Sequence, residues 1–203
     1  MRSLGRVEVS SWGFITGDGK MLVNDISPNH VITFWMQSGK DKWFSDDLEF
    51  SKLVSREFLV LWQKALTGRL AHWCESDDGL LALTIVLDQF PRIIFRDDVR
   101  SFCSGRDARH VANIALKKGV DERVDPLLKG FFYLPFWRSE NIEDQKKSID
   151  FFTQLGDADF LKNAKIYYDV ITRFGRFPHR NRILGRRSNN EEQAFLNSNQ
   201  FIG

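Results

Sequence analysis

The chain has 203 residues, of which 42% are hydrophobic and 28% charged, and its formal net charge is +2. This apolar content excludes an intrinsically disordered chain, and the nearly balanced charge argues against a generally basic nucleic-acid-binding protein. No apolar run approaches the roughly 18 residues that a membrane span needs, so we expect no membrane association.

The two cysteines, Cys74 and Cys103, lie far apart in the sequence and have no metal-ligand spacing. We therefore expect no metal site, and reduced thiols in a cytoplasmic setting. The sequence also lacks a Gly-rich phosphate loop and a nucleophile elbow, so no cofactor is expected.

Residues 1–25 form an N-terminal extension that differs from the rest of the chain. Short apolar stretches flank Gly17-Asp18-Gly19, which is compatible with a short β-hairpin or with a loose segment.

Residues 26–203 are predicted to form a single all-α domain, because apolar residues recur at helical spacing along this range. About eight helices with short connections favour antiparallel pairs, stacked as an irregular array or as a compact bundle. The predicted helices begin at or near Pro28, Asp46, Gly79, Ser104, Asp125, Asn141, Asp159 and Ser188.

Three of these helix starts carry capping signals. Ser27 precedes a proline at the first helical position, Asp46 is followed by Glu49, and Ser188 is followed by Glu191. Each pattern places an acceptor where the first backbone N–H groups of a helix lack partners.

The most informative segment is 173–187, which carries six arginines and one histidine. Gly175 and Pro178 interrupt a helix here, so Arg173, Arg176 and Arg180 are expected to radiate from a loop. Ordered arginines normally face planar anionic partners. The segment is therefore either an anion-binding site or the basic half of an internal salt-bridge lattice.

His179 lies among these arginines. Neighbouring positive charges disfavour its protonated form, so we expect a neutral imidazole. It could act as an acid–base group, or serve as a structural hydrogen-bond partner.

A second polar segment, Asp88-Gln89-Phe90-Pro91-Arg92, ends an otherwise apolar helix. A buried carboxylate must find a partner because an unpaired buried charge is costly. Asp88 is thus a candidate ion-pair partner for one of the arginines of the 173–187 segment, or a residue that contacts a ligand.

A third segment runs from Tyr133 to Asp144 and resembles the lip of a cleft, with Pro135 breaking the helix before Glu140. Glu140 or Asp144 could act as a general base if burial raised its pKa. The alternative is a role in helix capping and salt bridges.

These three segments, above all Arg173 through Asn181 with Leu184-Gly185-Arg186, resemble a bacterial family catalogued as domain of unknown function 924. The resemblance begins near Val31 and runs nearly to the C-terminus. It implies a tetratricopeptide-like all-α fold, and it implies no reaction.

The chain departs from the family pattern at three places. It has Ile93 where the pattern usually has Asn, Arg138 where it tends to have His, and Tyr167-Tyr168 where it tends to have His-Arg. If those histidines carry the family's chemistry, this member is altered or inactive.

Three hypotheses follow, ranked from first to third. The chain binds a small anionic ligand, a phosphate or carboxylate, in an Arg/His-lined cleft; or it is a scaffold that binds a peptide or protein; or it is a hydrolase or transferase. Oligomeric state is not predicted. The catalytic candidates are His179 and Glu140, and the candidate ligand-binding residues are Asp88, Arg92, Tyr133, Glu140, Asp144, Arg173, Arg176, His179, Arg180 and Arg186.

Overall fold

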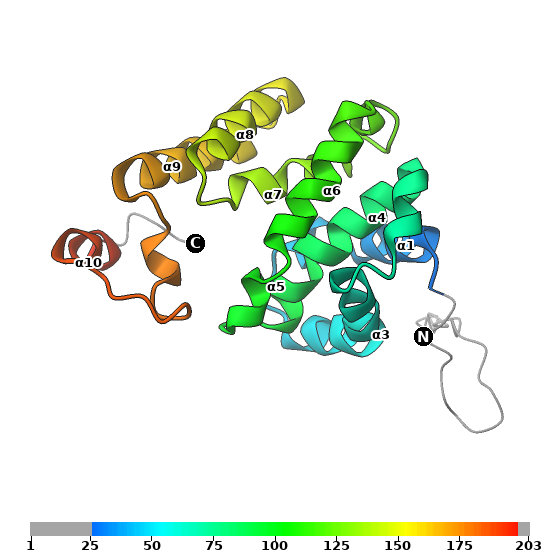
Figure 1. The fold of residues 1–203 in the computed structure, drawn as a ribbon, viewed down its shortest axis with the longest axis horizontal. Coiled ribbons are helices and arrows are strands. Elements are labelled where there is room, and N and C mark those ends of the chain that lie inside the picture. The colour runs from blue at the N-terminus through cyan, green and yellow to red at the C-terminus, as the bar shows by residue number, and fades with distance from the viewer. Residues whose placement is uncertain (1–25, 199–203) are drawn as a thin grey trace, which may run out of the picture.

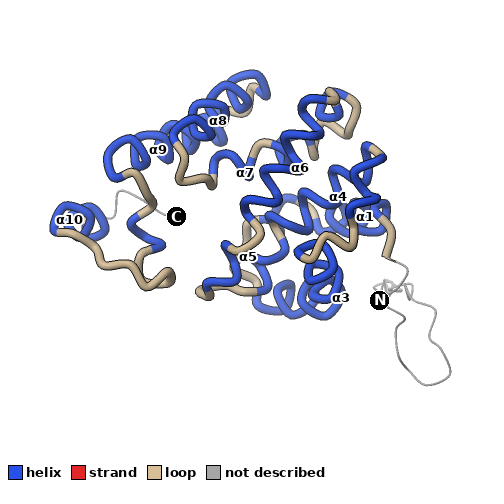
Figure 2. The backbone as a smooth tube through the Cα atoms, in the orientation of Figure 1, coloured by secondary structure: helices blue, strands red, loops and turns tan. Residues whose placement is uncertain are grey.

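The computed structural model describes residues 26–198, and the predicted extension at 1–25 lies outside this range. All regular structure between residues 26 and 198 is helical, which confirms the all-α prediction (Figure 2). The α-helices are α1 (Pro28–Ser38), α2 (Lys40–Trp43), α3 (Leu48–Leu66), α4 (Asp77–Asp88), α5 (Phe90–Ile94), α6 (Gly105–Lys117), α7 (Leu134–Trp137), α8 (Ile142–Leu155), α9 (Ala158–Phe174) and α10 (Asn190–Asn197). Short 3-10 segments between them are η2 (Ala71–Glu75), η3 (Val99–Phe102), η4 (Val120–Glu122), η5 (Lys129–Phe132) and η6 (Pro178–Arg180).

Helix α4 is the centre of the main core. Its residues 79–88 are all buried, as its uniformly apolar sequence predicts, and it packs against α1, α3 and α6 (Figure 1). Because α4 is surrounded by other helices, any polar group at its end must find partners inside the protein.

The antiparallel pair α8 and α9 lies beside this group, and the four-residue helix α7 connects the two parts (Figure 1). After α9 the chain turns at Gly175, which has a left-handed φ of 66° and caps the helix as such a glycine is expected to do. Residues 175–197 then run through η6 to α10, and we call this segment the C-terminal arm. A small second core of Val170, Ile171 and Phe177 joins α9 to the arm.

Two helix starts lie one residue later than predicted. Asp47, not Asp46, accepts from the backbone at the start of α3, and the capping box of α10 uses Asn189 and Glu192, not Ser188 and Glu191. In both places two adjacent residues can cap, and the structure uses the second. The predicted cap at Ser27 is confirmed.

The segment after Asp125 also differs from prediction. No long helix begins there; η5 is followed by α7, in which Pro135 occupies the first turn. A proline is tolerated at that position because its missing N–H would have no partner there. The result is a helix of one turn that ends immediately before Arg138.

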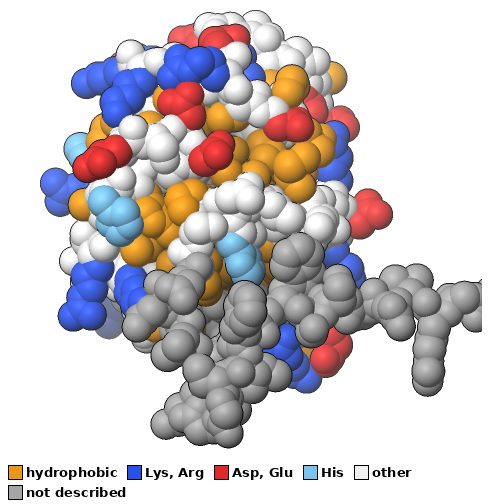
Figure 3. Space-filling view, turned by 90° about the vertical axis from the view of Figure 1, so that its right-hand side faces the viewer, with side chains coloured by type: hydrophobic (Ala, Val, Ile, Leu, Met, Phe, Trp, Pro, Cys, Tyr) orange, Lys and Arg blue, Asp and Glu red, His pale blue; other side chains and the backbone are white. Residues whose placement is uncertain are grey.

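The face on the right-hand side of Figure 1 carries acidic and basic side chains interspersed with patches of hydrophobic ones (Figure 3). Between residues 26 and 198, no helix combines the length and the hydropathy that crossing a membrane would require.

Candidate functional site

The candidate site begins with Asp88, the last residue of α4, whose side chain is only 1% exposed. Its Oδ2 accepts hydrogen bonds from the guanidinium of Arg138 and, at 2.6 Å, from Nε2 of Gln89. Arg92 Nε lies 3.7 Å from Oδ1. A carboxylate at the C-terminal end of a helix is disfavoured by the helix dipole. The arginines therefore supply the positive charge and the hydrogen bond that offset the burial of the Asp88 carboxylate.

Arg180 joins the same cluster from η6. It is 7% exposed and lies between two rings, with its guanidinium carbon 4.2 Å from the centroid of Phe177 and 5.1 Å from that of Phe102. Its Nη1 donates to the backbone carbonyl of Arg138 over 3.0 Å. Among the residues that the structure describes, no carboxylate lies within 4.0 Å of this guanidinium. Stacking on rings orients the cation but does not neutralise it.

We call Asp88, Arg92, Arg138 and Arg180 the Asp88 cluster. Burial and the charge of Arg138 lower the pKa of Arg92 to about 9, and burial lowers the pKa of Arg180 to about 10. Guanidinium groups nevertheless keep their protons at neutral pH. Arg92 and Arg138 thus share the single charge of Asp88, while Arg180 beside them has no carboxylate in contact and is acted on by the charge of Glu140, so positive charge is in excess within the cluster.

Three other arginines of the 173–187 segment have their own carboxylates. Arg173 pairs with Glu191 at 2.9 Å, Arg176 binds both oxygens of Glu192 at 2.6 and 2.8 Å, and Arg186 binds both oxygens of Glu140 at 2.8 and 2.9 Å. We call Arg173, Arg176 and Arg186 the paired arginines. Two of their three partners, Glu191 and Glu192, were not predicted, although they are the first acidic residues after the arginine run.

Glu140 holds the arm in place. Besides Arg186, its Oε1 accepts from the backbone N–H of Phe177 at 2.9 Å. Burial raises the pKa of Glu140, but the hydrogen bonds from Arg186 and Phe177 outweigh burial, and the net pKa is lowered. A carboxylate with a lowered pKa is a weak base, so the condition stated above for general-base catalysis is not met at Glu140.

His179 follows the prediction of a neutral imidazole. Burial, and then the charge of Arg180, lower its pKa to about 4. The sequence pointed to the neighbouring positive charges as the cause of the lowered pKa, whereas burial lowers it more. The ring lies next to Phe177, with centroids 5.5 Å apart.

Two further candidates make their contacts outside the Asp88 cluster. Tyr133 is buried and donates from its hydroxyl to Asp121 at 2.7 Å. Asp144 accepts from the Ser139 hydroxyl at 2.6 Å and pairs with Arg109 Nε at 3.2 Å. Both contacts tie secondary-structure elements together, and the structure gives neither residue a neighbour in the cluster.

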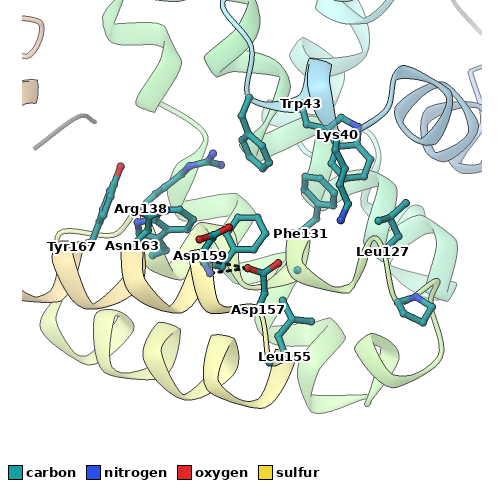
Figure 4. Close-up of a pocket in the computed structure, with 16 residues that line it drawn as sticks. Lys40, Trp43, Leu127, Phe131, Arg138, Leu155, Asp157, Asp159, Asn163 and Tyr167 are labelled. Atoms are coloured by element: carbon teal, nitrogen blue, oxygen red, sulfur yellow. Dashed lines mark hydrogen bonds between the residues drawn. The ribbon is translucent and has the colours of Figure 1, made fainter.

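A pocket of about 950 Å³ adjoins the Asp88 cluster (Figure 4). Arg138 and Tyr167, two positions at which the chain departs from the family pattern, lie together at one end of it, and Leu127 lies at the other. The pocket was not predicted, because its walls come from four separate parts of the chain. Six aromatic side chains line it: Trp43, Phe44, Phe131, Trp137, Phe160 and Tyr167.

The turn that carries Arg138 is held from outside by Gln145 of α8. Its amide nitrogen donates to the carbonyl of Trp137 at 2.5 Å and to that of Ser139 at 2.6 Å. With Arg180 on the Arg138 carbonyl, three successive carbonyls of this turn accept from side chains. Within residues 26–198, no group of three or more His, Cys, Asp or Glu side chains could hold a metal ion.

Comparison with known proteins identifies the family of this chain. Residues 31–200 match the family described as bacterial protein of unknown function (DUF924). A solved structure, that of a protein of unknown function, ATU0120, from Agrobacterium tumefaciens, is similar at 36% sequence identity. The likeness covers 84% of this chain and 97% of that one, with a TM-score of 0.81. No curated protein matches. By the extent of both likenesses, the chain belongs to the bacterial DUF924 family.

Proposed function

We propose that this protein binds a small anionic ligand, a carboxylate or a phosphate, at the Asp88 cluster. The observation that carries the proposal is that Arg92 and Arg138 have only Asp88 as a carboxylate partner at the end of the buried helix α4, while Arg180, on the Arg138 carbonyl, has no carboxylate within 4.0 Å among the described residues. The Nε atoms of Arg92 and Arg180 are buried and have no hydrogen-bond partner among the described residues. A bound anion would accept from such donors and offset the excess charge.

The paired arginines make this interpretation stronger. Each of them has a carboxylate supplied by the chain, two of them through both oxygens. Where an arginine serves only to stabilise the fold, the chain thus supplies a carboxylate that neutralises its charge. An anion from outside accounts for the lack of such compensation in the Asp88 cluster.

Catalysis receives less support than binding. Glu140 is occupied by Arg186 and Phe177, and His179 is neutral with a pKa of about 4. A neutral imidazole beside Arg180 suits hydrogen bonding to an anion better than proton transfer near neutral pH. We also propose a cytoplasmic location and membership of the tetratricopeptide-like superfamily. Cys74 and Cys103 are both free thiols, which is compatible with that location.

The test compares Arg180→Met with Arg176→Met. Thermal unfolding is followed in chloride buffer and with added inorganic phosphate, and phosphate binding is measured by calorimetry. We expect phosphate to stabilise the wild type and Arg176→Met, and to have no effect on Arg180→Met. Methionine keeps contact with the rings of Phe177 and Phe102.

The stability of Arg180→Met without phosphate supplies a second result. Losing the hydrogen bond to the Arg138 carbonyl is offset by removing a buried charge, so we expect a change within about 1 kcal/mol. A loss of about 3–5 kcal/mol, as expected for a broken buried ion pair, together with an unchanged phosphate response, would refute the proposal.

A further inference from the structure

The pocket and the Asp88 cluster share Arg138. One guanidinium nitrogen of this residue, Nη1, binds Asp88, while its Nε and Nη2 have no partner among the described residues. Its side chain is 16% exposed and lines the pocket (Figure 4). An anion in the pocket can therefore meet a charged donor pair that is already fixed on Asp88.

The pocket is too large, and its walls are too apolar, for a small inorganic anion alone to fill it. A volume of about 950 Å³ lies at the upper end of the range, roughly 300–1,000 Å³, of pockets that hold organic molecules. Ring-lined walls favour a flat aromatic ligand, which stacks or packs edge-to-face on such side chains. Trp43 and Phe131 already meet edge-to-face, with centroids 4.9 Å apart, and form a fixed part of the wall.

Charged side chains along the pocket favour one orientation of a bound anionic ligand. Asp157 and Asp159 line the pocket at the start of α9, and Asp157 is drawn farther from Arg138 than Asp159 is (Figure 4). Asp157 accepts from the backbone N–H groups of Asp159 and Phe160 at the start of α9, so its carboxylate is held in place. Asp157 repels an anionic group from its part of the pocket, whereas Arg138 attracts it. Lys40 also lines the pocket but is exposed to solvent.

We infer that the ligand is an organic anion with a planar aromatic body, such as an aromatic carboxylate. Its acidic group binds Arg138 at the edge of the Asp88 cluster, and its rings occupy the pocket between α2, η5, α7 and α9. This inference deepens the proposed function and rests on it.

Three probes separate the contributions of the acidic group and the rings. Calorimetry compares 2-naphthoate, which has both, with acetate, which has only the acid, and with 2-naphthylmethanol, which has only the rings. We expect 2-naphthoate to bind at least about tenfold more tightly than either of the other two.

Two kinds of protein variant also separate the contribution of the acidic group from that of the rings. Phe44 and Leu127 are 52% and 43% exposed, so Phe44→Ser and Leu127→Ser should fold normally. We expect each to weaken 2-naphthoate several-fold and to leave acetate and phosphate binding unchanged. Arg138→Gln should abolish the binding of all three anions, and if that variant does not fold, the probe comparison still decides.

The outcomes distinguish the two proposals. Phosphate or acetate binding with no advantage for 2-naphthoate would refute the inference and leave the proposed function standing. Equal binding of 2-naphthylmethanol and 2-naphthoate would refute the inference as well, because the pocket would then select rings without charge. Absence of binding by every anion would refute both proposals.

Discussion

The paired arginines and the Asp88 cluster use the same side chain in opposite ways. Arg176 and Arg186 each bind both oxygens of one carboxylate, while Arg92 and Arg138 share Asp88 and Arg180 contacts only the backbone carbonyl of Arg138 and two rings. The first arrangement neutralises charge and fastens the C-terminal arm. The second leaves positive charge at the edge of a ring-lined pocket. Local charge compensation, rather than the number of arginines, therefore separates a structural group from a candidate binding group.

Position along the chain does not separate the two groups. Arg180 lies between Arg176 and Arg186 in sequence but belongs to the Asp88 cluster, because η6 turns its side chain toward Phe177 and Phe102. Arg92 lies within α5, and Arg138 directly follows α7. A single run of basic residues thus serves both purposes.

The largest effect is expected from Asp88→Asn. Without this carboxylate, Arg92 and Arg138 lose their negative partner inside the protein, and the free energy of unfolding should fall by about 3–5 kcal/mol. Denaturant titration measures the change.

Asp77→Asn is the matched control for Asp88→Asn, because Asp77 pairs with Arg123 at the surface. It should change stability little. Added phosphate should restore part of the stability lost in Asp88→Asn and none in the control. A small effect of Asp88→Asn would remove the distinction between the two arginine groups.

A smaller loss is expected from Glu140→Gln, which keeps the shape of the side chain but removes the charge opposite Arg186. The hydrogen bonds from Arg186 and the Phe177 N–H weaken, and unfolding free energy should fall by about 2 kcal/mol. Phosphate binding should persist. Loss of anion binding in this variant, with the fold intact, would show that the paired arginines take part in the site.

The Arg176–Glu192 pair should respond to acid. The hydrogen bond from Arg176 lowers the pKa of Glu192 to about 2. Its stabilising contribution is present above the unfolded pKa of about 4.3 and is lost as the pH falls toward 2. Hydrogen exchange should therefore show that α10 loses protection across this interval while α4 is affected less.

Glu192→Gln is the control for that measurement. It should make α10 exchange faster at neutral pH and should remove the acid dependence. Acid sensitivity that persists in the variant would assign the effect to another group.

A second pH effect is expected at His179. Its lowered pKa of about 4 means that the unfolded chain takes up a proton near pH 6.5 whereas the folded chain does not, so stability falls as pH drops from about 6.5 to 4. NMR titration of the ring measures the pKa directly. Arg180→Met should raise this pKa, because a neighbouring positive charge is removed. A ring that titrates near 6.5 in the wild type would contradict the buried, positive environment.

The sequence predicted helix types well because helical spacing and caps are local signals. Ser27, Gly175 and the apolar run from Leu80 to Leu87 all occupy the expected places. Cap positions were ambiguous by one residue where two capping residues are adjacent, as at Asp46-Asp47. The segment after Asp125 could not be predicted from spacing, because its one-turn helix is stabilised by packing against its neighbours.

The candidate site was predictable only in part. Buried polar residues at the end of an apolar helix pointed to Asp88 and Arg92, and the arginine run pointed to Arg180. The grouping of arginines depends on which carboxylates the fold brings near them, and sequence spacing carries no such information. Arg138 was noticed only as a departure from the family pattern, and the pocket that it lines arises entirely from tertiary packing.

Gln145 has a consequence for the rate of ligand binding. It is fully buried and fixes the carbonyls on both sides of Arg138, so the backbone that carries this arginine has little freedom to rearrange. A ligand then meets a receptor that is already in its final shape. Association should proceed in one kinetic step at a rate set by diffusion and orientation, and affinities of different ligands should differ chiefly in how fast they dissociate.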